Sequence, residues 1–168
     1  MTIHEIAPSP ELAEYVDAYW WSDASSSGTL CILPDGCADV VFDPKGAFVV
    51  GAMTRPLRID AGESVGAFGI RFRPGRAAIA LGAPLTLLTD ARAPLRDVTK
   101  RFPTIDHRSM EKVEAALRSL LADAKSDPSA RIRASRRRVA QDLRARHALP
   151  SRHRDRAGWA GGMGGPRR

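Results

Sequence analysis

Hydrophobic residues near the N-terminus recur at the spacing of a helix. Apolar side chains between Leu12 and Tyr19 fall on one helical face, and Ser9-Pro10-Glu11 contains the residue types of a helix start. We therefore expect a helix that begins near Pro10. It should end between Tyr19 and Trp21, because residues 22–28 are turn-forming.

From residue 29 the pattern changes to short apolar runs separated by turn residues, which is typical of β-strands. Pro34-Asp35-Gly36 lies between the first two runs and indicates a hairpin. Closely spaced strands without long helices between them favour a mostly antiparallel sheet, arranged as a sandwich or a small barrel. The expected strands are 29–33, 38–42, 47–53, 57–60 and 65–73.

Helical patterns return after residue 75. Arg76 to Leu81 predicts a short helix, and a loop-rich stretch follows it through Pro94. The helical spacing is clearest from Ser109 to Ala124, where an apolar stripe should bury against the core or against a second subunit. The stripe comprises Met110, Val113, Leu117 and Leu120. The fold class is therefore α+β, with flanking helices around the sheet.

Charge divides the 168-residue chain into two unequal parts. Residues 1–128 carry 14 basic and 17 acidic side chains, whereas residues 129–168 carry 12 and 2. Since the last part also has few large apolar residues, only the first part can bury a core. We expect a folded domain over residues 1–125 and a largely disordered, Arg-rich tail over residues 126–168. Such a composition is also what a frameshifted or truncated end of GC-rich coding sequence would produce.

No pattern of catalytic or metal-binding residues stands out. Cys31 and Cys37 have neither a disulfide framework nor a zinc spacing, and His4 and His107 are isolated in sequence. We expect no enzyme activity, no metal and no cofactor. The chain has no secretory signal or membrane-length apolar run, so we expect a cytoplasmic protein with no membrane partner.

Four residues are candidates for binding a small molecule. Asp35 and Asp39 either present carboxylates to a ligand or belong to a turn. Arg71 lies opposite the apolar face of its strand and either binds an anionic group or pairs with one of these aspartates. Trp20 either stacks on a ligand or packs in the core.

The tail offers a separate candidate interface. Arg136, Arg137 and Arg138 lie in its most basic segment and would contact phosphates without reading sequence. The tail has too few apolar residues to pack a helix-turn-helix by itself.

Four phrases together resemble the N-terminal domain of a subgroup of AraC-type transcription regulators. The resemblance covers roughly residues 5–125, and the order of the phrases is more specific than any one of them. They are Pro10-x-Leu12-Ala13-x-Tyr15-Val16-x-x-Tyr19-Trp20, residues 33–42 (LPDGCADVVF), residues 50–54 (VGAMT) and residues 69–75 (GIRFRPG), followed by Leu87-Leu88-Thr89-Asp90 and Pro94-Leu95.

This resemblance implies a cupin-like β-domain that senses a small-molecule effector or forms a homodimer. The family binds DNA through a C-terminal helical domain of about a hundred residues with two helix-turn-helix units. The 40 residues after Pro128 lack that pattern, so we expect an AraC-type regulator reduced to its sensing domain, which does not itself read DNA. The alternatives are a stand-alone small-molecule binding module and non-specific nucleic-acid binding through the tail.

Overall fold

The computed structural model describes residues 2–23, 29–60 and 66–126. In these ranges strands and helices are mixed, and strands dominate the first 94 residues. The strands are β1 (Ile3–Ile6), β2 (Val16–Ser22), β3 (Thr29–Ile32), β4 (Ala38–Asp43), β5 (Gly46–Val50), β6 (Leu57–Asp60), β7 (Phe68–Phe72) and β8 (Arg92–Pro94). The helices are α1 (Ala77–Leu81), the 3-10 helix η1 (Leu85–Leu88), α2 (Leu95–Val98) and α3 (Met110–Ser126).

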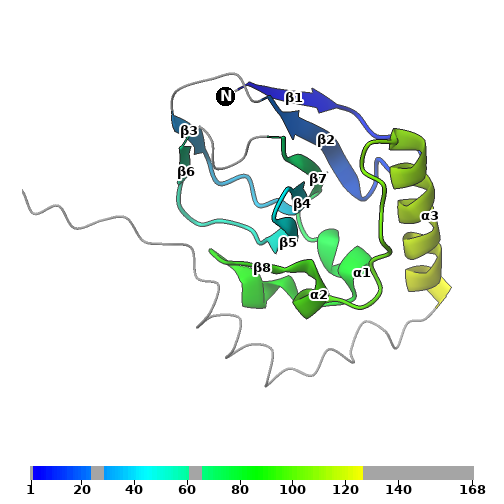
Figure 1. Cartoon of the computed structure of the whole chain (residues 1–168). Coiled ribbons are helices and arrows are strands. Elements are labelled where there is room, and N and C mark those ends of the chain that lie inside the picture. Colours follow the sequence, from blue (N-terminus) through cyan, green and yellow to red (C-terminus); the bar gives the residue numbers. More distant parts are fainter. Residues whose placement is uncertain (1, 24–28, 61–65, 127–168) are drawn as a thin grey trace, which may run out of the picture.

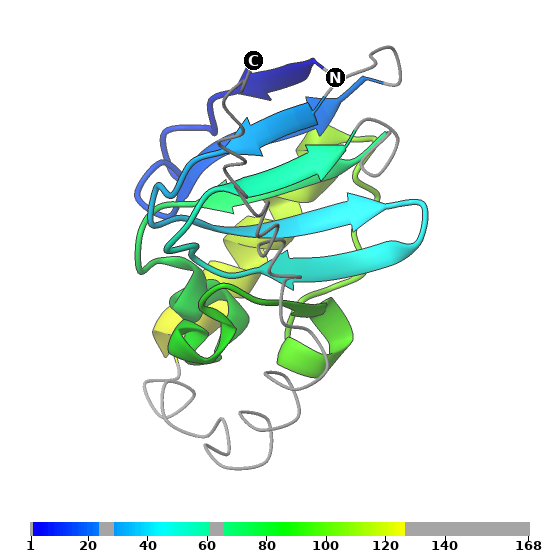
Figure 2. The same cartoon turned by 90° about the vertical axis from the view of Figure 1, so that its left-hand side faces the viewer.

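Six strands form one antiparallel sheet in the order β1-β2-β7-β4-β5-β8, and β3 pairs with β6 in a separate two-stranded sheet. The expected α+β class with a mostly antiparallel sheet is confirmed. The two sheets do not close on each other, so the small barrel is not formed. Figure 2 shows the strands with α3 passing behind them.

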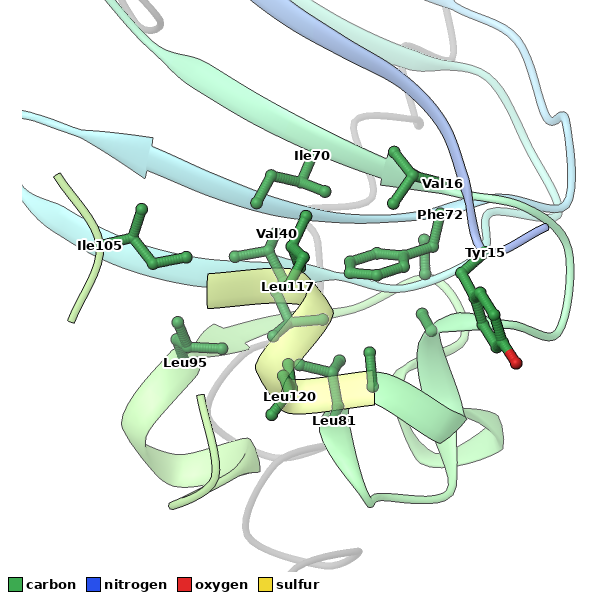
Figure 3. Packing of buried hydrophobic residues seen from close by; sticks show 14 of the residues in the cluster. Tyr15, Val16, Val40, Ile70, Phe72, Leu81, Leu95, Ile105, Leu117 and Leu120 are labelled. Carbon is green, nitrogen blue, oxygen red and sulfur yellow. The ribbon is translucent and has the colours of Figure 1, made fainter. Parts of the chain in front are cut away.

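The elements lie in three layers. In Figure 1, α3 lies on one side of the large sheet and the β3–β6 pair lies on the other. The core fills the space between the large sheet and the helices, where Val40, Ile70 and Phe72 meet Leu117 and Leu120 of α3 (Figure 3). The opposite face of the large sheet therefore faces the β3–β6 pair.

The expected helix over residues 10–21 is wrong. Two consecutive turns form after Ser9 in place of a helix. The Ser9 carbonyl accepts the backbone N–H groups of Leu12 and Ala13, the Leu12 carbonyl accepts those of Tyr15 and Val16, and the chain then enters β2. β2 is rich in aromatic residues, which favour strands, and the sheet supplies it with partners on both sides. Pairing within the sheet thus overrides the helical spacing of the apolar residues.

The expected hairpin between residues 29–33 and 38–42 is also wrong, although both strands exist. β4 pairs with β5 along one edge and with β7 along the other, so it has no free edge for β3. β3 pairs instead with β6, and its alternating exposure matches that of β6. The segment 33–37 connects the two sheets rather than two paired strands.

The helices after residue 75 agree with their expected positions. α1 and α3 are present, and Val113, Leu117 and Leu120 of the apolar stripe are buried, while Met110 is partly buried. The apolar stripe of α3 packs against the core of the same chain, which is the first of the two expected alternatives.

Several expectations lie outside the described residues. These are the Arg-rich tail from residue 127, its expected disorder, and the candidate contacts Arg136, Arg137 and Arg138. Residues 24–28 and 61–65 lie outside them as well.

Candidate functional site

The face of the large sheet that lies away from the core carries two rows of side chains. Directly opposed residues of antiparallel strands point to the same face, so the register defines each row. One row is charged and the other is largely apolar. The charged row runs Ala18, Arg71, Asp39, Val50 and Arg92, and the apolar row runs Trp20, Gly69, Val41, Phe48 and Pro94.

The small sheet provides the opposite wall. Leu30 pairs with Ile59 and Ile32 pairs with Leu57, which places these four apolar residues on one face of the β3–β6 pair. Ile32, Leu57 and Ile59 line a cavity of about 1000 Å³ together with the two rows of the large sheet. The cavity continues around the β4–β5 turn toward residues 99–107. Its volume is at the upper end of the range usual for small-molecule sites, about 300–1000 Å³.

All four predicted site residues line this cavity. Trp20 Nε1 donates a hydrogen bond of 3.3 Å to Asp39 Oδ2. Arg71 Nε lies 3.8 Å from Asp39 Oδ1 and 3.9 Å from Asp35 Oδ2. The sequence thus identified a group of residues that the fold brings together, although their binding of a ligand stays a prediction.

Gly69 allows Trp20 to reach Asp39. These two residues are opposed in the β2–β7 register, and a Cβ atom at position 69 would overlap the Trp20 indole ring. The indole therefore lies across the glycine and extends toward β4, where Asp39 is found. Trp20 is partly buried and faces the cavity, whereas Tyr15 and Tyr19 pack in the core.

The two aspartates have different local roles. Asp35 Oδ1 accepts the backbone N–H of Cys37 at 2.8 Å, which is the turn geometry that its sequence context suggested. Asp39 is not part of a turn, because it lies within β4 between β5 and β7. Both carboxylates nonetheless lie beside Arg71.

Two further charged residues belong to the site and were missed in the sequence. Glu5 on β1 accepts a hydrogen bond of 2.8 Å from Arg71 Nη1. Arg92 ends the charged row on β8, and its guanidinium carbon lies 5.5 Å from the centre of the Phe48 ring. The sequence placed Arg92 in a loop-rich stretch and assigned no element to residues 3–6. Ile3-His4-Glu5-Ile6 shows no strict alternation of apolar and polar residues, so the signal for β1 was weak.

Burial changes the acidity of Asp39. Its pKa is raised to about 7, mainly by burial and further by the charges of Asp35 and Glu5, while Arg71 and the Trp20 hydrogen bond act in the opposite direction. Asp39 Oδ1 is buried and has no hydrogen-bond partner among the described residues. This oxygen is therefore an acceptor without a donor at the wall of the cavity.

The surroundings of Arg71 and Cys37 also shift the pKa values of these two side chains. Burial lowers the pKa of Arg71, but Asp39, Glu5 and Asp35 outweigh it, and the net pKa is raised. Burial, followed by the charge of Asp35, raises the pKa of the Cys37 thiol to about 11. Arg71 therefore stays charged, and Cys37 stays a neutral thiol near pH 7, which makes it a poor nucleophile.

The remaining candidate chemistry is dispersed. Cys31 and Cys37 are free thiols. His4 pairs with Asp23 at 2.7 Å, and His107 stacks on Phe42, with 5.5 Å between ring centres. In residues 2–23, 29–60 and 66–126, no three His, Cys, Asp or Glu side chains gather as a metal site. Over the same part of the chain, no helix is both long and apolar enough to cross a membrane.

Comparison with known proteins assigns the chain to a family. No curated protein and no solved structure matches it. One family model, described as a domain of unknown function, matches residues 4–94. The match spans more than half of the chain and contains every strand from β2 to β8, together with most of β1. The chain therefore belongs to the DUF6597 family.

Proposed function

We propose that this chain is the effector-sensing and dimerisation domain of an AraC-type transcription regulator, and that its effector binds in the cavity between the two sheets. The ordered phrases that resemble AraC-type N-terminal domains support the regulatory part of the proposal. A β-domain whose two sheets enclose a cavity also agrees with the cupin-like architecture that the resemblance implies.

One observation carries the binding part of the proposal, namely the buried, unpartnered Oδ1 atom of Asp39 at the cavity wall. A buried acceptor without a donor costs about 1–3 kcal/mol in free energy of folding. A ligand N–H or O–H group that donates to this oxygen would remove that penalty. Trp20 donates to the other carboxylate oxygen, and Arg71 Nε lies 3.8 Å from Oδ1, which is within ion-pair distance but too far for a hydrogen bond.

The test of effector binding uses the full chain and a variant with a filled cavity. Val50 lies in the charged row between Asp39 and Arg92, outside the core, so Val50→Phe should narrow the cavity without disturbing the packing against α3. A library of small metabolites is screened by thermal unfolding. We expect at least one compound to raise the unfolding temperature of the wild-type chain and not of Val50→Phe. Compounds that stabilise both proteins equally would contradict binding in the cavity.

The dimerisation part is tested separately by analytical ultracentrifugation of the full chain over a wide concentration range. A reversible dimer is expected. A monomer at every concentration would remove this part of the proposal and leave effector binding intact.

A stand-alone small-molecule binding module is the second candidate, because the cavity alone accounts for it. Transcript levels in cells with and without the chain distinguish the two. Transcripts that respond to the chain, and that lose the response with Val50→Phe, favour the regulator. No responding transcript, together with effector binding in vitro, favours the stand-alone module.

A further inference from the structure

We propose that the effector is an organic anion with an apolar, ring-like body, and that Arg92 binds its anionic group. This inference rests on the proposed function, since it requires the cavity to be the effector site. It follows from two observations: some charged side chains around the cavity are already paired, and apolar side chains line two opposite walls.

Arg71 is not available for an incoming anion. Its guanidinium donates to Glu5 at 2.8 Å and lies within 4 Å of Asp35 and Asp39. Three carboxylates thus surround one cation, so an anion placed there would meet more negative than positive charge. The middle of the charged row is therefore unfavourable for an anionic group.

Arg92 differs from Arg71 in this respect. No carboxylate of the described residues lies within ion-pair distance of it, and its guanidinium lies over the Phe48 ring. An arginine on an aromatic face keeps its N–H groups free for a carboxylate, sulfonate or phosphate. Arg58, Lys45 and Lys100 also line the cavity, as does Asp43 at the β4–β5 turn. Basic side chains therefore outnumber acidic ones on this side of the cavity.

The apolar side chains that line the cavity indicate what shape of ligand it can hold. Phe48 and Val41 form the floor beside Arg92, and Ile32, Leu57 and Ile59 form the opposite wall. A molecule between them contacts apolar side chains on both of its faces, which favours an aromatic or other ring system. Arg92 and Asp39 are separated by one strand in the same row, or roughly 10 Å between backbones. A molecule of one or two rings fits that span.

A cationic effector is the opposite possibility, with its charge on Asp39. Arg71 disfavours it, because the guanidinium lies 3.8 Å from the same carboxylate oxygen. The free Oδ1 atom is better matched by a neutral N–H or O–H group on the ligand body. The geometry therefore separates the two polar ends, with a neutral donor at Asp39 and an anion at Arg92.

Two fluorescent dyes of matched shape test the inference on the full chain. The probe is 8-anilinonaphthalene-1-sulfonate, and N-phenyl-1-naphthylamine has the same ring skeleton without the sulfonate. We expect Arg92→Gln to weaken binding of the sulfonate dye about tenfold, the scale of one charge-assisted hydrogen bond, and to leave binding of the neutral dye within about twofold. Arg55→Gln, which removes an exposed arginine outside the cavity lining, should change neither affinity.

The other outcomes separate this inference from the proposed function. If Arg92→Gln weakens both dyes equally or neither, or if only the neutral dye binds, the anionic class is overturned and the cavity can still be the effector site. Val50→Phe, which places a phenyl ring between Asp39 and Arg92, should weaken binding of both dyes. If both dyes bind Val50→Phe as well as they bind wild type, the cavity is not the binding site, and the proposed function fails too. Circular dichroism of each variant verifies that the fold is retained.

Discussion

At the scale of single residues, Asp39 connects the stability of the fold with its site. Its carboxylate is placed in the second position of a central strand, beside Arg71 and Trp20, and burial favours its protonated form. A carboxylate in this position weakens the folded state once it ionises. The residue is therefore explained more readily by binding than by folding.

Replacing Asp39 with Asn should alter the pH dependence of stability. The pKa of Asp39 is about 7 in the folded chain and about 4 when unfolded, so its stabilising contribution is complete below pH 4 and is lost as the pH rises through 7. Between pH 5 and pH 8 the wild type should lose about 2 kcal/mol of unfolding free energy relative to Asp39→Asn. Urea unfolding at the two pH values measures this difference.

Asp97→Asn is the control, because it removes the same charge from an exposed position on α2. It should follow the wild-type pH profile. If Asp39→Asn also follows that profile, Asp39 does not titrate near neutral pH in the folded chain.

Gly69 provides a second test at this scale. Gly69→Ala places a methyl group where the Trp20 indole lies, so the indole must move away from Asp39. We expect a loss of about 1–3 kcal/mol in unfolding free energy, as for other overpacked positions, and a changed tryptophan fluorescence spectrum. In a Trp20→Leu background the same alanine should cost much less. An equal cost in both backgrounds would show that Trp20 does not determine the need for glycine.

At the scale of elements, local patterns identified most strands but not their partners. The apolar runs at β3 to β7 and the helical spacing in α3 depend on short-range periodicity, which the sequence displays directly. Pairing depends on which strand edges remain free. β4 has both edges occupied, so the adjacent β3 must pair elsewhere. The first expected helix is wrong for a related reason, because residues 16–22 pair with β1 and β7 as a strand.

The candidate site was predictable to the same extent. Asp39 and Arg71 fall in two strands that the sequence predicted, and they are directly opposed in the register. Trp20 was expected at the end of a helix that does not form, and its strand brings it to the same site. Glu5 and Arg92 lie on the two edge strands, which are short and give a weak periodic signal. Only the long-range register brings them onto the same face.

The role of α3 can be tested by a single truncation. Leu117 is fully buried between α3 and the large sheet, as Figure 3 illustrates. Leu117→Ala should lower the unfolding free energy by about 2–5 kcal/mol, and Ser119→Ala on the exposed side of α3 should change it by less than about 0.5 kcal/mol. Urea denaturation provides both values. A small effect of Leu117→Ala would show that α3 is not part of the cooperative core.

At the scale of the whole molecule, charge is distributed unevenly along the sequence. The first 128 residues are slightly acidic, and the last 40 carry the net positive charge. Binding of nucleic acid, if it occurs, is therefore expected to come from the arginines of the tail. It would also depend strongly on salt and little on sequence.

Changing Arg136, Arg137 and Arg138 together to Gln in the full chain tests this possibility. If they bind phosphates, the logarithm of the affinity for DNA should fall less steeply with the logarithm of salt concentration, by about 0.9 for each phosphate that is no longer neutralised. Fluorescence anisotropy with labelled duplexes of two unrelated sequences measures the slope. An unchanged slope would exclude these three arginines from the interface.

The ion pair between Arg71 and Glu5 joins the cavity to the outermost strand of the large sheet. If β1 detached, one of the three carboxylates around Arg71 would leave with it, and the guanidinium would become more attractive to anions. The selectivity of the cavity therefore depends on a four-residue segment near the start of the chain. A deletion that removes Glu5 with β1 should therefore alter what the protein binds, even if every cavity residue on β4, β5 and β8 were untouched.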